Sequence, residues 1–503
     1  MTSINSTEKK ATIPDDLESQ EKQHVEVVED IALQSWAGYL RKLTGAGIEM
    51  RGLEPVPAEN RNHTKYYNIF TLFGGSFLTL LPLTIGISPT LAFGLSFKHA
   101  AAMIVSAQFI FIWPTLYILS LAPLLGMRQS VQFRYAFGKY PNILISLIII
   151  LEVTIFGILA TVSGAQCLAA VRPGTLPVEG AIGIILAIAF LISFIGYRAI
   201  HILCEYIWIP SVISLLVLAG CAGSQLQNQA PASSSGPAPY LATVAVCASN
   251  MATWGTLVGD YACYMPPNAP RARIAFYCLM GLYVPFTIMM IFGAAIGGGI
   301  LAIPAWSDAY KQSDVGGVIG EILISRVGNF GRFILILLGL SIVTTSARDM
   351  YSMSLFTVAA VPWLRRIPRV AILCCALGIF LGVAIAASRS FLPTLSTLVM
   401  LAGYMTGPTV CVFLIEYVYF RKADPKQLDH AIWDDASALP SGISAIISST
   451  VPWVLIVMSM DTAWYVGPIA RRVGDLAYEL GTASAGVLYF LLRKIEIRWR
   501  GRL

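Results

Sequence analysis

One apolar stretch of the sequence carries side chains that could bind a ligand. Residues 248–266 read ASNMATWGTLVGDYACYMP and are apolar enough to lie at membrane depth. They nevertheless include groups that a lipid-facing helix would lack: Asn250, Thr253, Trp254, Gly255, Gly259 and Asp260. Such groups are tolerated where the backbone lines a cavity, which predicts a broken helix at a binding site. The alternative is a helix whose small residues only allow close packing, with Asp260 at its cytoplasmic end.

Four ionisable side chains lie in apolar stretches: Glu152, Asp260, Arg348 and Asp349. Such residues are costly in a membrane and are therefore candidates for function. A carboxylate that can change its charge state on burial is the natural carrier for proton coupling, which makes Glu152 and Asp260 candidates. Each has a structural alternative, because Asp260 could organise an inner loop through backbone hydrogen bonds and Glu152 could only balance an arginine. Arg348 needs a partner, for which Glu152 is the first candidate and Asp260 the second.

Depth along the helices favours a Glu152–Arg348 pair. Asp349 is a poor partner for Arg348, since adjacent helical residues do not face each other. With a rise of about 1.5 Å per residue, Glu152 lies roughly 12 Å inward of Ala160. By the same rise, Arg348 lies roughly 4 Å inward of Thr345. If Ala160 and Thr345 lie at the same level, the two charges are about 8 Å apart in depth, and two long side chains can close much of that gap. The rival is that Arg348 binds an anionic substrate directly.

The composition indicates a polytopic membrane protein. The chain has 503 residues, of which 56% are hydrophobic and 12% charged, whereas soluble domains carry roughly 25% charged residues. The nine cysteines show no CxxC pair and no zinc spacing, and the five histidines fall in the tail, loops or segment edges. We therefore expect no metal site, no cofactor and no catalytic constellation, and the net charge of +6 does not indicate a nucleic-acid partner.

Twelve segments are long enough to span a bilayer. They are 67–93, 98–125, 140–170, 177–197, 202–222, 239–261, 273–303, 329–359, 369–387, 391–419, 442–460 and 474–493. We expect no cleavable signal peptide before them, because the first apolar stretch begins only near Tyr67. Alternate loops are rich in arginine and lysine, which predicts that both termini are cytosolic. Residues 1–35 should be a disordered cytosolic tail, 36–66 a cytosolic pre-membrane segment and 494–503 a second cytosolic tail.

Several segments should be interrupted. LPLTIGISPT, at 81–90, should break the first segment, and 248–266 should break the sixth. A polar interruption at 344–349 falls in the eighth. Breaks in the first and sixth are what two inverted five-helix repeats would produce, here 67–222 and 239–419, followed by two extra helices at 442–493.

Short motifs in order along the chain resemble the fungal purine–cytosine permeases of the nucleobase–cation symporter family. The motifs are GIEMRGLEPVP before the first segment, FRYAFG at 133–138, SGAQ at 163–166, IGYRAIH at 195–201, WGTLVGDYACYMP at 254–266, GLYVP at 281–285 and IEYVYFRK at 415–422. The resemblance covers roughly residues 45 to 495. It implies an all-α leucine-transporter-type fold of five plus five inverted helices with two more at the C-terminus. It also implies proton-coupled import of nucleobases at a site between segments one, three, six and eight.

Carried over from the resemblance, the substrate-side positions are Thr84, Phe156, Ala160, Asn250, Trp254, Thr345 and Ser346. Two departures concern asparagines of the family pattern: Ala160 replaces one in the third segment, and Thr345 and Ser346 replace an adjacent pair in the eighth. An asparagine offers both a donor and an acceptor to a base edge, and alanine offers neither. We therefore predict weak recognition of cytosine.

Other residues have two interpretations each. Trp254 beside Gly255 suits a planar ring, with Phe156 as the opposing aromatic, but both could simply pack. Gln166 could reach a substrate or bridge helices. GAAIGGG at 293–299 is best explained by helix packing.

The function expected from the sequence is proton-coupled import of a nucleobase or related planar nitrogen heterocycle, in a protein of the plasma membrane. Its partners would be that small molecule, protons and the lipid bilayer. An enzyme is disfavoured by the missing catalytic constellation, and a channel by polarity confined to helix breaks. The closest alternative is a transporter of the same fold for another solute, such as a vitamin or a secondary metabolite.

Overall fold

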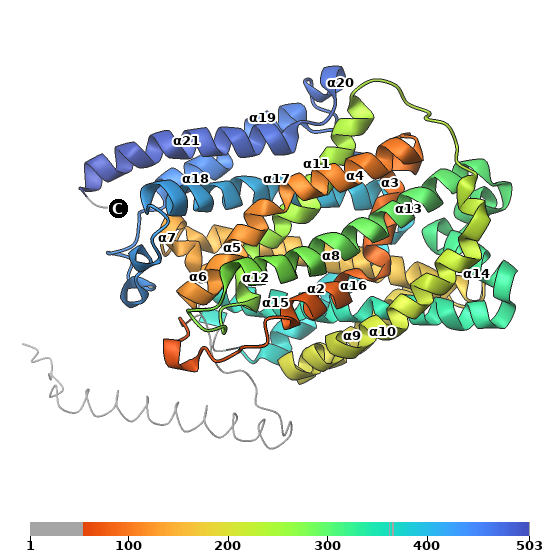
Figure 1. Ribbon diagram of the computed structural model, residues 1–503, viewed down its shortest axis with the longest axis horizontal. Helices are drawn as coiled ribbons and strands as arrows, with labels where there is room; N and C mark the ends of the chain where they lie inside the picture. The colour runs from red at the N-terminus through yellow and green to blue at the C-terminus, as the bar shows by residue number, and fades with distance from the viewer. Residues whose placement is uncertain (1–53, 362, 365–366, 502–503) are drawn as a thin grey trace, which may run out of the picture. The chain divides into compact units, whose positions relative to one another are not determined.

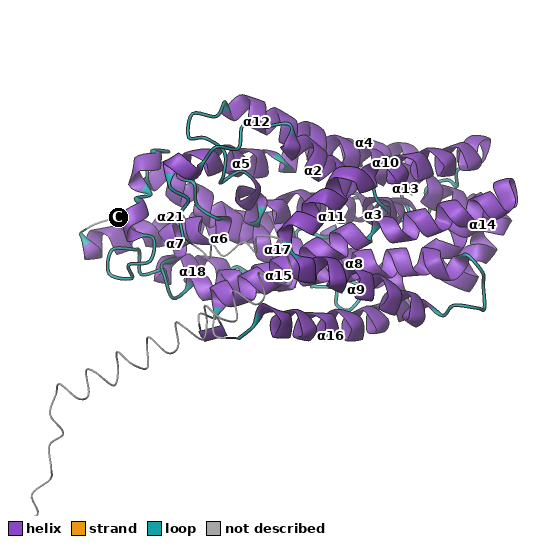
Figure 2. Ribbon diagram, turned by 90° about the horizontal axis from the view of Figure 1, so that it is seen from below, coloured by secondary structure: helices purple, strands orange, loops and turns teal. Residues whose placement is uncertain are grey.

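The computed structural model describes residues 54–361, 363–364 and 367–501 (Figure 1). These are helical almost throughout, apart from connecting loops and one isolated antiparallel bridge between Asp461 and Val466 (Figure 2). The tail predicted at 1–35 and most of the pre-membrane segment predicted at 36–66 lie outside the described residues.

Each of the twelve predicted segments lies on helices of the structure. In chain order these are α2 (Asn68–Phe77) with α3 (Leu80–Leu91), α4 (Phe97–Phe111) with α5 (Trp113–Leu125), α8 (Asn142–Ala170), α9 (Val178–Ile195), α10 (Tyr197–Ala222), α11 (Ala238–Ala252), α12 (Arg271–Cys278) with α13 (Val284–Ala302), α14 (Pro304–Ser341) with α15 (Val343–Ala360), α16 (Arg369–Ala387), α17 (Phe391–Ile415), α18 (Ile443–Thr450) with α19 (Trp453–Ser459), and α21 (Ala477–Arg500).

Helix length and apolarity give fewer spans than the twelve predicted from the sequence. Within the described residues, seven helices are long and apolar enough to cross a membrane, or eight if the bent pair α2–α3 counts as one span. Two of the seven, Pro304–Val358 and Arg369–Phe420, have 55 and 52 residues, far more than the roughly 20 that one crossing needs. The count of twelve is therefore not confirmed, although the helical positions are.

The predicted break in the first segment exists but lies earlier than expected. α2 and α3 meet at an angle of 56° across Leu78 and Thr79, the second of which is extended at φ −137° and ψ 177°. The break precedes the prolines of 81–90 because Pro82 falls in the first turn of α3. There its missing N–H costs no intrahelical hydrogen bond.

The sixth segment is broken as predicted, and the eighth is not interrupted where expected. α11 ends at Ala252 and is followed by two short 3-10 turns, Thr253–Thr256 and Val258–Tyr261. In the eighth segment the discontinuity is at Ile342, and 344–349 is regular helix within α15. The Thr344 hydroxyl fits there because it bonds the preceding turn, donating to the Ser341 carbonyl at 2.8 Å.

Helix packing repeats with a shift of five segments. α3 packs on α13 as α11 packs on α4, and α2 packs on α10 as α11 packs on α17. Likewise α8 packs on α9 as α15 packs on α16, and α8 and α15 pack on each other. This is the pattern that two structurally equivalent five-helix halves produce. α18 and α19 lie against α21, which runs along α17 (Figure 1).

Glycines allow the close approach of α3 and α13. A Cβ atom added to Gly86 would lie less than 3.0 Å from backbone atoms of Met290, and one added to Gly293 less than 3.0 Å from the Leu83 carbonyl. The Thr90 hydroxyl also donates to the Ala294 carbonyl across this contact, at 3.0 Å. The glycine-rich run of 293–299 therefore serves packing, as the sequence indicated.

A buried ionic network attaches α21 to the C-terminal end of α17. Glu416 accepts hydrogen bonds from Nε and Nη2 of Arg493, both at 2.9 Å, from Nε of Arg421 at 3.0 Å and from the Tyr489 hydroxyl at 2.9 Å. Arg493 is fully buried and also contacts Glu496 at 3.2 Å. These contacts explain why α21 continues to Arg500, so that the tail predicted at 494–503 begins inside a helix.

We expect Gly293→Ala to destabilise the protein strongly, because the new methyl group meets backbone that cannot move without separating α3 from α13. Gly378→Ala is the matched control, since nothing lies within 4 Å of the added Cβ there and alanine favours a helix by about 1 kcal/mol. The measurement is the thermal unfolding temperature of the detergent-purified variants. Equal temperatures for the two variants would contradict the packing argument.

We expect Glu416→Gln to lower the free energy of unfolding by about 3–5 kcal/mol, because two arginines lose the charge that compensates their burial. Asp308→Asn removes an exposed ion pair with Lys311 at 3.4 Å and should change it by less than about 1 kcal/mol. Denaturant unfolding of both variants in detergent compares the two. A loss at Glu416 no greater than at Asp308 would show that the network does not hold α21.

Candidate substrate site

A cavity lies where the break in the first segment meets the break in the sixth. Its volume, counted as space for the centres of water-sized molecules, is about 30 Å³. It is lined by α2, α3, α8, α15, Phe286 of α13 and the turn after α11, through Ser76, Phe77, Leu81, Pro82, Glu152, Val153, Phe156, Thr253, Trp254, Leu257, Phe286, Thr345, Arg348 and Asp349. Because about 10–15 Å³ of such space holds one water, a ring can enter only if lining side chains move.

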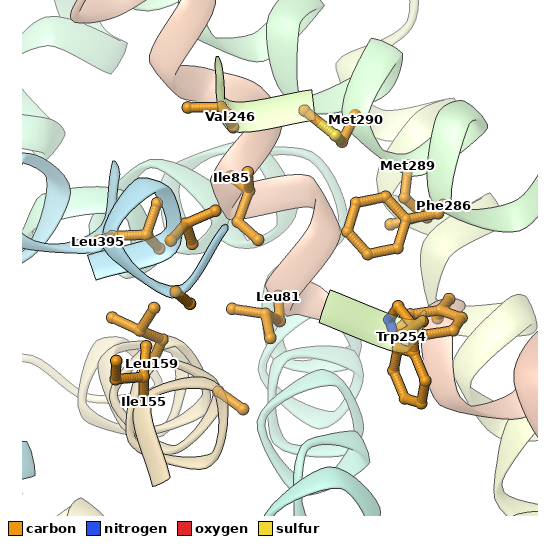
Figure 3. Packing of buried hydrophobic residues seen from close by; sticks show 14 of the residues in the cluster. Leu81, Ile85, Ile155, Leu159, Val246, Trp254, Phe286, Met289, Met290 and Leu395 are labelled. Carbon is orange, nitrogen blue, oxygen red and sulfur yellow. The ribbon is translucent and has the colours of Figure 1, made fainter. Parts of the chain in front are cut away.

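Aromatic rings form one wall of the cavity. Trp254 packs edge-to-face on Phe73 and Phe77, with ring centroids 5.3 and 5.1 Å apart, and Phe77 also contacts Phe286 at 5.1 Å. Trp254, Phe286 and Leu81 of α3 all line the cavity, and their side chains are labelled in Figure 3. Such packing fixes the indole, so the break after α11 presents a rigid aromatic surface.

The predicted Glu152–Arg348 pair is wrong. Arg348 Nε donates to Asp349 Oδ1 at 3.1 Å, and Glu152 Oε2 accepts from the Thr256 hydroxyl at 2.8 Å. Asp349 is a better partner than its position suggested, because the arginine side chain is long enough to fold across the 100° between adjacent helical residues. The Arg348 guanidinium also lies over the Trp254 ring, 5.2 Å from its centroid, in a cation–π contact.

Two polar atoms of the lining lack a hydrogen-bond partner among the described atoms. They are the Thr345 hydroxyl oxygen and Oδ2 of Asp349, on residues 4% exposed each. Residues four apart on a helix share a face, so both atoms belong to the side of α15 that lines the cavity. Buried polar groups are costly to leave unpaired, which makes these atoms candidates for ligand contact.

Five of the residues predicted for the site line the cavity: Phe156, Trp254, Thr345, Glu152 and Arg348. The structure brings them together from three segments far apart in the sequence. The other predicted residues lie outside the lining: Thr84, Ala160, Gln166, Asn250, Ser346 and Asp260.

The side chains outside the lining are packed or bonded within the protein, and only Oδ1 of Asn250 and Oε1 of Gln166 among them lack a partner in the described residues. The Thr84 hydroxyl and the Asn250 amide each donate to the carbonyl four residues earlier, Leu80 and Val246, both at 2.9 Å. The hydroxyls of Ser346 and Thr161 bond each other at 2.9 Å across α15 and α8.

The remaining three are explained by packing and by a loop contact. Ala160 is fully buried, and the backbone of Gln166 lies against Gly316 of α14. Asp260 accepts from the Gln129 backbone N–H at 2.6 Å and contacts Arg128 at 4.0 Å. The structural alternative given for Asp260 therefore describes its position here.

Sequence reasoning missed several lining residues, mainly Ser76, Phe77, Phe286 and the role of Asp349. Ser76 and Phe77 directly precede the break, so a break predicted at Leu78 would have identified them as lining residues. Phe286 directly follows the GLYVP motif, but nothing in its neighbourhood distinguishes it from an ordinary apolar residue.

Comparison with known proteins supports a transporter. The family described as "Permease for cytosine/purines, uracil, thiamine, allantoin" matches residues 55–481. Purine-cytosine permease FCY21 of Saccharomyces cerevisiae is 26% identical over 92% of this chain and 89% of its own length. Vitamin B6 transporter TPN1 of the same organism is 23% identical over 92% and 90%.

The fold is shared with a solved transporter. Mhp1, a nucleobase-cation-symport-1 family transporter in a closed conformation with bromovinylhydantoin bound, superposes with a TM-score of 0.65 at 14% identity, over 89% of this chain and 95% of Mhp1. The predicted leucine-transporter-type arrangement is thereby confirmed, as is the expectation that the chain is a transporter and not an enzyme. The protein belongs to the family of permeases for cytosine, purines, uracil, thiamine and allantoin.

Proposed function

We propose that this protein imports a nucleobase or a related planar nitrogen heterocycle together with protons, at the plasma membrane and with both termini cytosolic. The observation that carries the proposal is the cavity at the paired helix breaks, where Trp254 and Phe156 supply ring surfaces beside polar groups of α8 and α15. Flat aromatic surfaces bind planar rings, and a few placed polar groups select among them. The purine-cytosine permeases among its relatives favour a nucleobase.

The second candidate is another solute on the same fold, and the vitamin B6 transporter among the relatives favours it. The loss of amide side chains at Ala160, Thr345 and Ser346 also weighs against a cytosine site. An uptake competition panel separates the two candidates. Adenine, hypoxanthine, cytosine, uracil, thiamine and pyridoxine are tested as competitors for uptake in cells that express the protein, and the strongest competitor shows whether the substrate is a nucleobase or a vitamin.

Glu152 is the side chain best suited to carry the proton. It is 2% exposed, lines the cavity and accepts from the Thr256 hydroxyl. Among the residues that the structure describes, it has no ion-pair partner within 4 Å, whereas Asp349 pairs with Arg348 and Asp260 lies outside the cavity. Because an unpaired buried charge is costly, protonation of Glu152 removes a cost that the other two carboxylates do not carry.

We expect the uptake of the preferred substrate to fall when a protonophore collapses the proton gradient, and Glu152→Gln to abolish this dependence. Glutamine keeps the shape and accepts the Thr256 hydrogen bond, but it cannot exchange a proton. Uptake with and without protonophore is measured for the wild type, Glu152→Gln and the surface control Asp308→Asn.

Wild-type uptake that ignores the protonophore would remove proton coupling from the proposal. A Glu152→Gln variant that keeps the full protonophore effect would assign the proton to another group. Asp308→Asn should behave as the wild type, since both Asp308 and its partner Lys311 are exposed.

We expect Thr345→Asn alone to raise cytosine uptake, by on the order of tenfold for one good hydrogen bond. Of the three replaced amide positions, only Thr345 lines the cavity. Ser346 is bonded to Thr161, and an amide at Ala160 would enter packed core.

The controls are Thr345→Val, which has the same size without the hydroxyl and should not gain uptake, and Ser346→Asn. Radiolabelled cytosine uptake, corrected for surface expression, measures the effect. Efficient cytosine uptake by the unmodified protein, or an equal gain from Ser346→Asn, would contradict the prediction.

A further inference from the structure

Asp349 carries an unused acceptor into the cavity. The residue is 4% exposed and lines the cavity from α15. Its Oδ1 receives Arg348 Nε at 3.1 Å, while Oδ2 has no partner among the described atoms. A carboxylate accepts at both oxygens and donates from neither when ionised. The site therefore lacks a hydrogen-bond donor at this point, and a substrate can supply it.

The formal charges of the lining also favour a donor or a cation. With Glu152 ionised, the lining holds two carboxylates, Glu152 and Asp349, and one guanidinium, Arg348. Uncompensated charge inside a protein is costly, so a ligand that brings N–H donors or positive charge is favoured over an anion. The Thr345 hydroxyl, one turn from Asp349 and also without a partner, can accept a second donor.

The contacts of Arg348 show how a planar group with N–H donors fits into the cavity. Its guanidinium is planar and delocalised, lies 5.2 Å from the centroid of the Trp254 ring and donates to Asp349 at 3.1 Å. A planar heterocycle in which an amino group sits beside a ring N–H presents the same donor pair and the same flat face. Such a ring can use the same indole and the same carboxylate once Arg348 has moved aside.

We propose that Asp349 is the specificity-determining residue of the site and that it selects heterocycles with an amidine-type donor edge over rings with a carbonyl in its place. This inference rests on the proposed function, since it assumes that the cavity binds the transported ring. In this arrangement the amidine edge donates to Asp349 Oδ2, and the ring lies against Trp254 and Phe156. A charge-assisted hydrogen bond of this kind discriminates strongly against an acceptor in the same position.

The test compares two bicyclic rings of equal size. 2-Aminobenzimidazole carries the amidine-type edge, and 2-hydroxybenzimidazole, which exists as the cyclic urea, carries a carbonyl in its place. Binding of each to the detergent-purified protein is measured by calorimetry, which needs no transport. We expect the amino compound to bind the wild type at least tenfold more tightly.

The substitution Asp349→Asn should reduce this preference to less than threefold, mainly through weaker binding of the amino compound. Because it leaves Arg348 without a charged partner, the double variant Arg348→Met/Asp349→Asn removes the pair as a unit and should lose the preference in the same way. Asp308→Asn, with the same chemical change on the exposed surface, should keep the wild-type ratio.

Equal binding of the two rings to the wild type, binding of neither, or an unchanged ratio in the Asp349 variants would overturn the assignment. These outcomes are independent of the proposed function, which is decided by the uptake panel. Nucleobase uptake without preference for the amino ring would refute the role of Asp349 alone. Absence of uptake for every heterocycle, with the binding preference intact, would refute the transport proposal alone.

Discussion

In a bilayer, every backbone N–H and C=O group must find a partner inside the protein, and the site depends on where this constraint is relaxed. Helices α2 and α3 separate at Leu78 and Thr79, and α11 gives way to 3-10 turns after Ala252. Unpaired backbone is tolerated only where it is buried in protein or lines a cavity. The two breaks meet at one cavity, so the exception to regular helix and the place for a ligand coincide.

The close packing of the two halves makes such breaks stable. Gly86 and Gly293 let α3 and α13 approach to backbone contact, and the hydroxyl pair of Thr161 and Ser346 joins α8 to α15. In hydrocarbon no hydrophobic effect drives helices together, so small residues and interhelical hydrogen bonds have to do so. Ser346 is a polar residue of the predicted site that lies outside the cavity. Its hydrogen bond to Thr161 contributes instead to the packing of the helices around the cavity.

The sequence predicts the helical segments well because their length and apolarity are local properties that the bilayer imposes. It predicts the location of the site through Trp254 and Phe156, since aromatic and polar residues in apolar stretches are informative one by one. It does not predict which face of a helix a residue occupies relative to a break. Because the first break is predicted a few residues too late, Phe77 is missing from the predicted site. Ala160 is part of the predicted site although it is fully buried by packing.

The partner of Arg348 shows why charges are the hardest part to infer. Ideal helix geometry separates adjacent residues, and from it the sequence predicts Glu152, on another helix, and not Asp349 as the partner. A guanidinium at the end of a flexible stem is not bound to the direction of its Cα–Cβ bond, and it settles where a carboxylate and an aromatic face are both within reach. In this cavity Asp349 and Trp254 meet that condition together. Glu152 is consequently left with a hydroxyl as its partner, so one carboxylate of the cavity lies in an ion pair and the other in a hydrogen bond to a neutral group.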